Sequence, residues 1–241
     1  MPTKARYTRV LVGSNGSGWA ADFSSVSNSL EVALNAARLE DTTFQATAAT
    51  FVTGDPTGSI KQQGYYTNTG AGTLETELAD AIEGGEALYV TALFDTAATQ
   101  PIAYVAQLTN TDNMAIAAPV ANLITLNGSW PQGTGILRGV QLSTGTIAAT
   151  GGQTHIDMGT AGSAGGVAWL YVTAVTGTAT NATCTVESDD ENTFTAAATE
   201  GTFTFSGEGC YAITLSGTIN RYVRLNCTSK GGATSFAVFA I

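Results

Sequence analysis

The stretch ALYVTALF, residues 87–94, decides how the rest of the chain is interpreted. Successive side chains of a β-strand point to opposite faces, and here both faces are apolar. The same is true of IAYVAQL, residues 102–108. Strands of this kind are typical of positions that are covered on both sides. We therefore expect these two segments to be central strands of a sheet, or strands with a layer on each face.

The alternation continues towards the N-terminus, around a single helix. Residues 28–36 (NSLEVALNA) and 58–66 (GSIKQQGYY) each predict a strand. Between them and the central pair, residues 72–85 (GTLETELADAIEGG) predict a helix with one apolar face, an N-cap at Thr73 and a stop at Gly84. The acidic residues on its other face are typical of a solvated helix surface and do not indicate a catalytic cluster.

Beyond the central pair the pattern changes to short strands separated by Gly and Thr turns. The sequence LNGSWPQGTG, residues 126–135, interrupts the apolar pattern. Regularly spaced short strands after it predict an all-β sandwich. The boundaries that follow are a first domain at 1–130, a linker at 131–135 and a second domain at 136–241. In RYVRLN, residues 221–226, we expect Val223 and Leu225 to face inwards.

Composition limits the classes of function. Charged residues make up 12% of the 241 residues and the net charge is −10, with an isoelectric point near 4.3. This balance argues against a nucleic-acid-binding protein, which needs basic stripes. Few charges and many small polar residues suit a surface that neighbouring molecules cover. There is no apolar run long enough to span a membrane and no signal-peptide pattern at the N-terminus. The three cysteines therefore predict free, buried thiols.

A search for catalytic, cofactor or metal sites gives none that we would assign. His155 is the only histidine, and its proximity to Asp157 lacks the nucleophile of a catalytic triad. The segment ESDDENTF, residues 187–194, holds four carboxylates and leaves a calcium loop open as an alternative. A polar hairpin turn explains it better. We therefore expect no enzyme activity, no cofactor and no metal.

The stretch ARLEDTTFQATAATFV, residues 37–52, reads as a long connection between two strands. Its carboxylate pair, Glu40 and Asp41, has no base, metal ligand or oxyanion donor beside it. A long excursion of low charge that carries apolar residues suits a contact with another copy of the chain. The candidates for that contact are Leu39, Asp41, Thr42, Thr43, Phe44 and Phe51.

Residues 22–66 also carry a family resemblance. The segment resembles the N-terminal part of the tail tube, or major tail, proteins of long-tailed bacteriophages. Residues 113–130 fit the same pattern, and the second half resembles the extra β-sandwich of some of these proteins, most clearly at 168–177 and 217–226. The sequence departs from the pattern at RLEDTTF, where an additional residue shifts the spacing. The positions that match are Asp22, Asn28, Ser29, Leu30, Leu39, Asp41, Thr43, Phe44, Phe51, Gly54, Gly58, Gly64 and Tyr65.

The resemblance implies a fold and a role. It implies a mainly β protein, with a tail-tube-like barrel or sandwich domain with one short helix at 1–130 and an outer decorating sandwich at 136–241. Such subunits form hexameric rings that stack into a tube for genome ejection, made in the host cytoplasm and located in the virion tail. The partners implied are other copies, the tape measure, terminator and tail tip proteins, and DNA as transiting cargo. An acidic channel would repel the DNA phosphates.

A second class of function stays open at this point. The chain is alternatively a binding module, either a capsid decoration protein or a carbohydrate-binding adhesin. In that interpretation Trp169, Tyr171 and Tyr211 supply an aromatic face in the second half.

Overall fold

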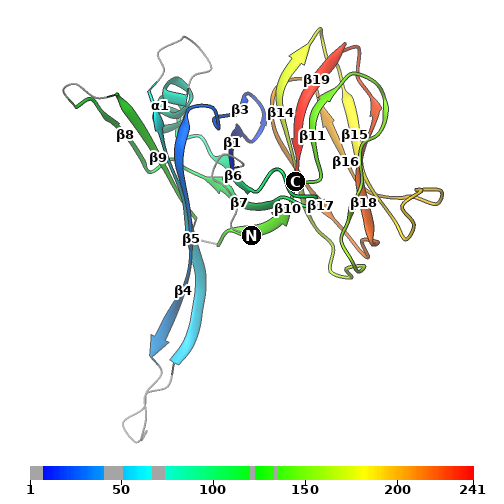
Figure 1. Cartoon of the computed structure of the whole chain (residues 1–241), viewed down its shortest axis with the longest axis horizontal. Helices are drawn as coiled ribbons and strands as arrows, with labels where there is room; N and C mark the ends of the chain where they lie inside the picture. The colour runs from blue at the N-terminus through cyan, green and yellow to red at the C-terminus, as the bar shows by residue number, and fades with distance from the viewer. Residues whose placement is uncertain (1–7, 41–50, 67–73, 120–122, 133–134) are drawn as a thin grey trace, which may run out of the picture.

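The computed structural model describes residues 8–40, 51–66, 74–119, 123–132 and 135–241, which form a mainly β protein (Figure 1). The mainly β class with sandwich packing is therefore confirmed. Four antiparallel sheets and one helix, α1 (Leu74–Gly84), make up the fold, and none of the sheets closes into a barrel among these residues. No described helix is long and apolar enough to cross a membrane.

Two sheets are built from strands between residues 9 and 140. The central sheet has the order β10-β7-β6-β1-β3, and its strands are β1 (Arg9–Ser14), β3 (Ala20–Asp22), β6 (Leu88–Phe94), β7 (Ile102–Thr109) and β10 (Leu137–Val140). The hairpin sheet has the order β4-β5-β9-β8, with β4 (Ser27–Glu40), β5 (Phe51–Tyr65), β8 (Asn113–Ala117) and β9 (Thr125–Gln132). A two-residue strand, β2 (Gly16–Ser17), lies between β1 and β3 in sequence.

Two further sheets form the sandwich of the second half. The inner sandwich sheet has the order β11-β19-β14-β17, with β11 (Ser143–Ile147), β14 (Gly166–Thr176), β17 (Gly209–Leu215) and β19 (Ser235–Ala240). The outer sandwich sheet contains β12 (Gly151–Gly152), β13 (Ile156–Asp157), β15 (Ala182–Asp189), β16 (Ala198–Phe205) and β18 (Tyr222–Ser229).

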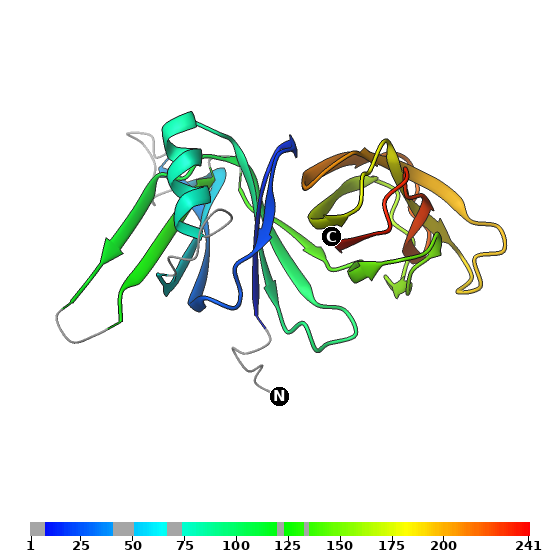
Figure 2. The ribbon, with the colours of Figure 1, turned by 90° about the horizontal axis from the view of Figure 1, so that it is seen from above.

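The central sheet is covered on both faces, as its sequence predicts. Leu88 and Val90 of β6 face a core that the central sheet shares with the hairpin sheet and α1. Tyr89 and Leu93 of the same strand face the opposite way, into a core shared with the inner sandwich sheet. Figure 2 shows the resulting layers, with the central sheet between the hairpin sheet and the sandwich. β1, β6 and β7 therefore each contribute side chains to two cores.

The core on the hairpin side is organised by Trp130, whose side chain is completely buried. Its indole N–H donates a hydrogen bond to the Thr111 hydroxyl at 3.0 Å. A Cβ at Gly128 would lie 2.8 Å from the Trp130 ring, so glycine makes room for the indole. Helix α1 packs Leu78 and Ala81 into the same core, which confirms the predicted amphipathic helix. The predicted cap Thr73 lies outside the described residues.

The core on the sandwich side, called the interface core below, joins the two halves of the chain. Gly13 of β1 permits close approach, since a Cβ there would lie 2.9 Å from the Cys210 Cβ. Thr91 of β6 and Tyr171 of β14 are both fully buried, and their hydroxyls share a hydrogen bond of 2.8 Å. Burial raises the pKa of the Tyr171 phenol well above its usual value, so the hydroxyl stays neutral.

The sandwich has the inward residues that the sequence predicts. Val223 and Leu225 are buried between the two sandwich sheets, while Tyr222 and Arg224 point to the other face and are half-buried. Cys184, Cys210 and Cys227 are free and buried, which confirms the prediction for the thiols.

The expected linker at 131–135 begins within β9, because Pro131 and Gln132 are the last residues of that strand. Residues 137–140 form β10 and pair with β7 at the edge of the central sheet, before the chain enters β11. The division into residues 1–130 and 136–241 therefore remains a prediction from the sequence, and the interface core is the place to test how tightly the two halves are coupled.

We predict that Tyr171→Phe lowers the free energy of unfolding by about 1–2 kcal/mol, because it leaves the buried Thr91 hydroxyl without this partner. Urea unfolding monitored by fluorescence measures the loss. The double variant Thr91→Val with Tyr171→Phe should recover part of it, since both polar groups are then absent. A Tyr171→Phe protein as stable as the wild type would contradict this role of the hydrogen bond.

Candidate assembly surface

The hairpin formed by β4 and β5 extends beyond the rest of its sheet. β9 pairs with β5 only from Gly58 to Tyr65. On the other side of Gly58, β4 and β5 continue to pair with each other as far as Glu40 and Phe51. In this overhang no third strand lies alongside among the described residues, and Figure 1 shows it projecting away from the body of the molecule. Leu34, where the overhang begins, has 56% of its surface exposed.

Both lateral edges of the hairpin sheet are open. β4 pairs only with β5 and β8 pairs only with β9, so no other described strand covers their outer edges. With 14 residues, β4 offers a long row of backbone donors and acceptors. Long open edges of this kind favour pairing with another chain, and proteins normally cover them. The edge strand β4 is therefore suited to completing its hydrogen bonds in an assembly.

One face of the hairpin sheet is polar and uncovered. Cross-strand partners share a face, and Glu31 is paired with Lys61, which in turn is paired with Ser129. Glu31 and Lys61 are exposed and lie 3.8 Å apart. A shallow depression of about 420 Å³ lies on this face, lined by Ser29, Glu31, Lys61, Gln63, Asn113 and Asn127. The face thus presents amides and hydroxyls, together with one charge pair.

The end of the hairpin sheet opposite the overhang is apolar. Tyr65 of β5 pairs with Thr125, and the Tyr66 N–H donates a hydrogen bond to the Ile124 carbonyl. Ile116 of β8 pairs with Leu126 of β9, the residue that follows Thr125. Tyr65, Ile116, Leu123 and Ile124 each have between 41% and 67% of their surface exposed. These four residues, called the apolar end below, are a second surface that is suited to contact with another molecule.

Only part of the predicted contact loop lies within the described residues. Leu39 pairs with Val52, so Leu39 and Phe51 are strand residues near the end of the hairpin and not loop residues. Asp41, Thr42, Thr43 and Phe44 lie outside the described residues. The role of all six residues in a contact between subunits remains a prediction.

The segment that contains His155 and the acidic segment 187–194 meet on the outer sandwich sheet. His155 packs between the rings of Phe194 and Tyr222, with centroids 5.8 and 5.6 Å away. Asp157 is turned to Arg221, which donates to both carboxylate oxygens at 2.8 and 2.7 Å. These hydrogen bonds lower the pKa of Asp157 to about 2. Asp157 is therefore an ion-pair partner of Arg221, while His155 is held between aromatic rings.

The carboxylates of residues 187–191 are used mainly by the fold. Glu187 accepts hydrogen bonds from Arg224 at 2.9 Å and from Asn226 at 2.6 Å. Asp189 accepts the backbone N–H groups of Glu191 and Ala196, which lowers the pKa of its carboxyl. Among the residues that the structure describes, no three His, Cys, Asp or Glu side chains gather closely enough to hold a metal ion. This geometry is that of an ordered polar turn.

The alternative interpretation as an adhesin needs a binding face made of Trp169, Tyr171 and Tyr211. Trp169 and Tyr171 point from β14 towards the central sheet and are buried in the interface core, and Tyr211 is half-buried against Phe205. They are buried because β14 is apolar on both faces, like β6, and its second face meets another sheet. The three rings therefore do not form one exposed face on which sugars could stack.

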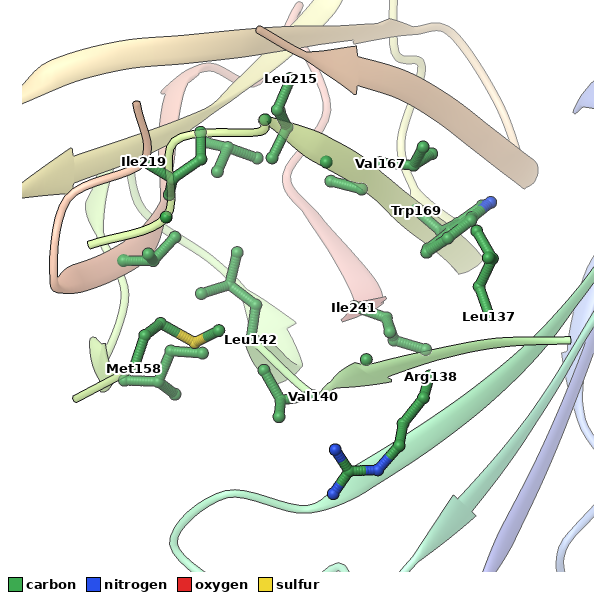
Figure 3. Close-up of a pocket in the computed structure, with 18 of the residues that line it drawn as sticks. Leu137, Arg138, Val140, Leu142, Met158, Val167, Trp169, Leu215, Ile219 and Ile241 are labelled. Carbon is green, nitrogen blue, oxygen red and sulfur yellow. The ribbon is translucent and has the colours of Figure 1, made fainter. Parts of the chain in front are cut away.

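A pocket of about 480 Å³ does lie at one end of the sandwich (Figure 3). Its walls include Leu142, Met158, Trp169 and Ile241. The lining is mostly apolar, with Arg138 as its one charged residue. A pocket of this chemistry suits an apolar group and is poorly matched to a sugar, whose hydroxyls need hydrogen-bond partners.

No protein-family model matches the sequence, and a search of curated proteins finds no match. The fold is similar to solved structures of tail proteins. The SPP1 tail tube is 12% identical with a TM-score of 0.47, over 59% of this chain and 81% of that chain. The tail of an empty gene transfer agent particle is 9% identical, with a TM-score of 0.42, over 54% and 95%. The SPP1 Dit protein is 12% identical with a TM-score of 0.32, over 96% and 98%. At these values no function follows from the likeness.

The ion pair of Asp157 predicts a defined acid sensitivity. The pKa of Asp157 in the folded protein is about 2, against an ordinary value of 3.8. Its contribution to stability is therefore present above about pH 4 and is lost as the pH falls through about 2. The unfolding temperature of Asp157→Asn should lie below that of the wild type at neutral pH, and the difference should shrink between these two values. Asp190→Asn, which changes an exposed acid, is the control. A difference that stays constant down to pH 2 would contradict the assignment.

Proposed function

We propose that the chain is a structural subunit of a phage-type tail tube, which assembles into stacked rings around a channel. The observation that carries this proposal is the hairpin sheet, with its open edges at β4 and β8 on opposite sides. If β4 of one copy pairs with β8 of the next, every copy uses two different edges. Such a head-to-tail contact generates a closed ring when the rotation between neighbouring copies equals a full turn divided by the number of copies. The sequence resemblance implies that the ring is hexameric.

In this arrangement the polar face of the hairpin sheet lines the channel. Its other face is buried against the central sheet and α1, so it is unavailable. On the channel side the charges of Glu31 and Lys61 offset each other, and the remaining lining residues of the depression are uncharged. A surface without a basic stripe gives DNA phosphates no anchor. In this proposal DNA is therefore transiting cargo that the channel does not bind.

Stacking of rings uses the two ends of the hairpin sheet. The overhang of β4 and β5 reaches the adjacent ring, where the apolar end of the next copy is available to be covered. The sandwich lies on the far side of the central sheet from the channel and forms the outside of the tube. The subunit is non-catalytic and needs no cofactor. Its partners are other copies and the remaining tail proteins, and its location is the virion tail after synthesis in the host cytoplasm.

The proposal predicts that the purified, concentrated protein forms rings and short tubes with a central channel, visible by negative-stain electron microscopy. The physical reason is the hydrogen-bonding capacity of the edges of β4 and β8. A protein that stays monomeric at high concentration, with no rings, would contradict the proposed function.

A hairpin variant separates ring formation from stacking. Replacing residues 35–57 by an Asn-Gly turn connects Leu34 to its direct partner Gly58, removes the overhang and leaves the pairing of β5 with β9 from Gly58 onwards intact. We expect this variant to form rings but no tubes. Met158→Ala, an exposed change in the sandwich, should form tubes like the wild type. Tubes formed by the hairpin variant would refute the role of the overhang while leaving the ring in place.

A further inference from the structure

Two of the three thiols face each other across the outer sandwich sheet. Cys184 of β15 and Cys227 of β18 are direct partners in the antiparallel register. Such partners have Cα atoms about 4.5–5.5 Å apart, which lies inside the range of about 4.4–6.8 Å found for disulfides. Both side chains are completely buried in the sandwich core. The strand register thus places the two cysteines opposite each other on the core face of the sheet.

We propose that Cys184 and Cys227 are a site of reversible oxidation, at which a cross-strand disulfide fastens β15 to β18. The segment between them contains β16 of the outer sandwich sheet and β17 of the inner one. A link between the two cysteines therefore closes a loop that includes strands from both layers of the sandwich. Closing such a loop reduces the conformational entropy of the unfolded chain and so stabilises the folded one.

The oxidant is a small disulfide, such as the oxidised form of a low-molecular-weight thiol. One cysteine thiolate attacks it, releases one small thiol and forms a mixed disulfide. The second cysteine then displaces the other small thiol, so that the pair loses two protons and two electrons and the small disulfide gains them. Burial raises the pKa of both thiols, which makes thiolate scarce in the folded protein. The reaction is therefore slow in the native state and fast while the sandwich folds or opens.

The location of the site makes it independent of the proposed assembly. The β-bulge at Thr228, next to Cys227, lies near the end of β18. Opening of this strand end exposes the pair without disturbing the central sheet. Cys210 provides an internal control, because it is buried in the interface core beside Tyr171 and has no cysteine partner across its strand pair. The protein thus folds with reduced thiols in the cytosol and forms the disulfide in oxidising surroundings.

The experiment is refolding in a buffer of reduced and oxidised glutathione, followed by tryptic digestion without reductant and mass spectrometry. Cleavage after Arg224 and Lys230 releases Cys227 on the peptide LNCTSK, whereas Cys184 and Cys210 both lie on the peptide 139–221. We expect these two peptides to be joined, with the loss of two hydrogen atoms, in the wild type and in Cys210→Ala. The joined species should be absent from Cys184→Ala and from Cys184→Ser.

A second readout is the thermal unfolding of the intact protein. The oxidised wild type should unfold several degrees higher than the reduced one, and dithiothreitol should reverse the shift. The oxidised and reduced samples of Cys184→Ser should unfold at the same temperature. Failure of the wild type to form the joined peptides, their appearance in Cys184→Ser, or a lower unfolding temperature after oxidation would each overturn the proposal. None of these outcomes bears on ring formation, so the two proposals fail separately.

Discussion

Burial of the central sheet on both faces is the constraint on which the rest of the structure depends. The two faces of β6 are both completely buried, one at Val90 and the opposite one at Leu93. Removing either neighbouring layer would expose a row of apolar side chains, at a cost of roughly 25 cal/mol for each Å² of apolar surface. The sandwich is therefore held to the first half of the chain by hydrophobic contact as well as by the Thr91–Tyr171 hydrogen bond.

This constraint determines what remains available for function. With the central sheet enclosed, the hairpin sheet keeps one free face and its long lateral edge at β4. The sandwich uses Trp169 and Tyr171 in its contact with the central sheet, and both residues are buried there. The acidic turn at 187–191 is occupied in hydrogen bonds of its own. The unsatisfied hydrogen-bonding capacity thus favours association with other copies, which is the basis of the proposed tail-tube role.

Much of the fold follows from side-chain periodicity, and the failures have identifiable causes. The apolar faces of 87–94 and 102–108 predict covered strands, and the i, i+4 pattern predicts α1. The beginning of β5 at Phe51 was missed because Gly54 and Pro56 are typical of a turn. In the structure Pro56 pairs with Ala36 beside a β-bulge, one of the few places where a strand accepts proline. The burial of Tyr171 was missed although β14 has the same two-faced apolar pattern as β6. That pattern indicates that a second layer covers the strand, but it does not indicate which sheet forms that layer.

The central claim is that β4 and β8 complete their hydrogen bonds only in an assembly, whereas β6 and β7 are already enclosed in one molecule. Amide hydrogen exchange measured on dilute monomer and on concentrated protein tests this claim directly. The account predicts slow exchange in β6 and β7 at both concentrations. It predicts fast exchange of the outward-facing amides of β4 and β8 that becomes slow on assembly. Slow exchange along both strands in the dilute monomer, or no change on concentration, would contradict it.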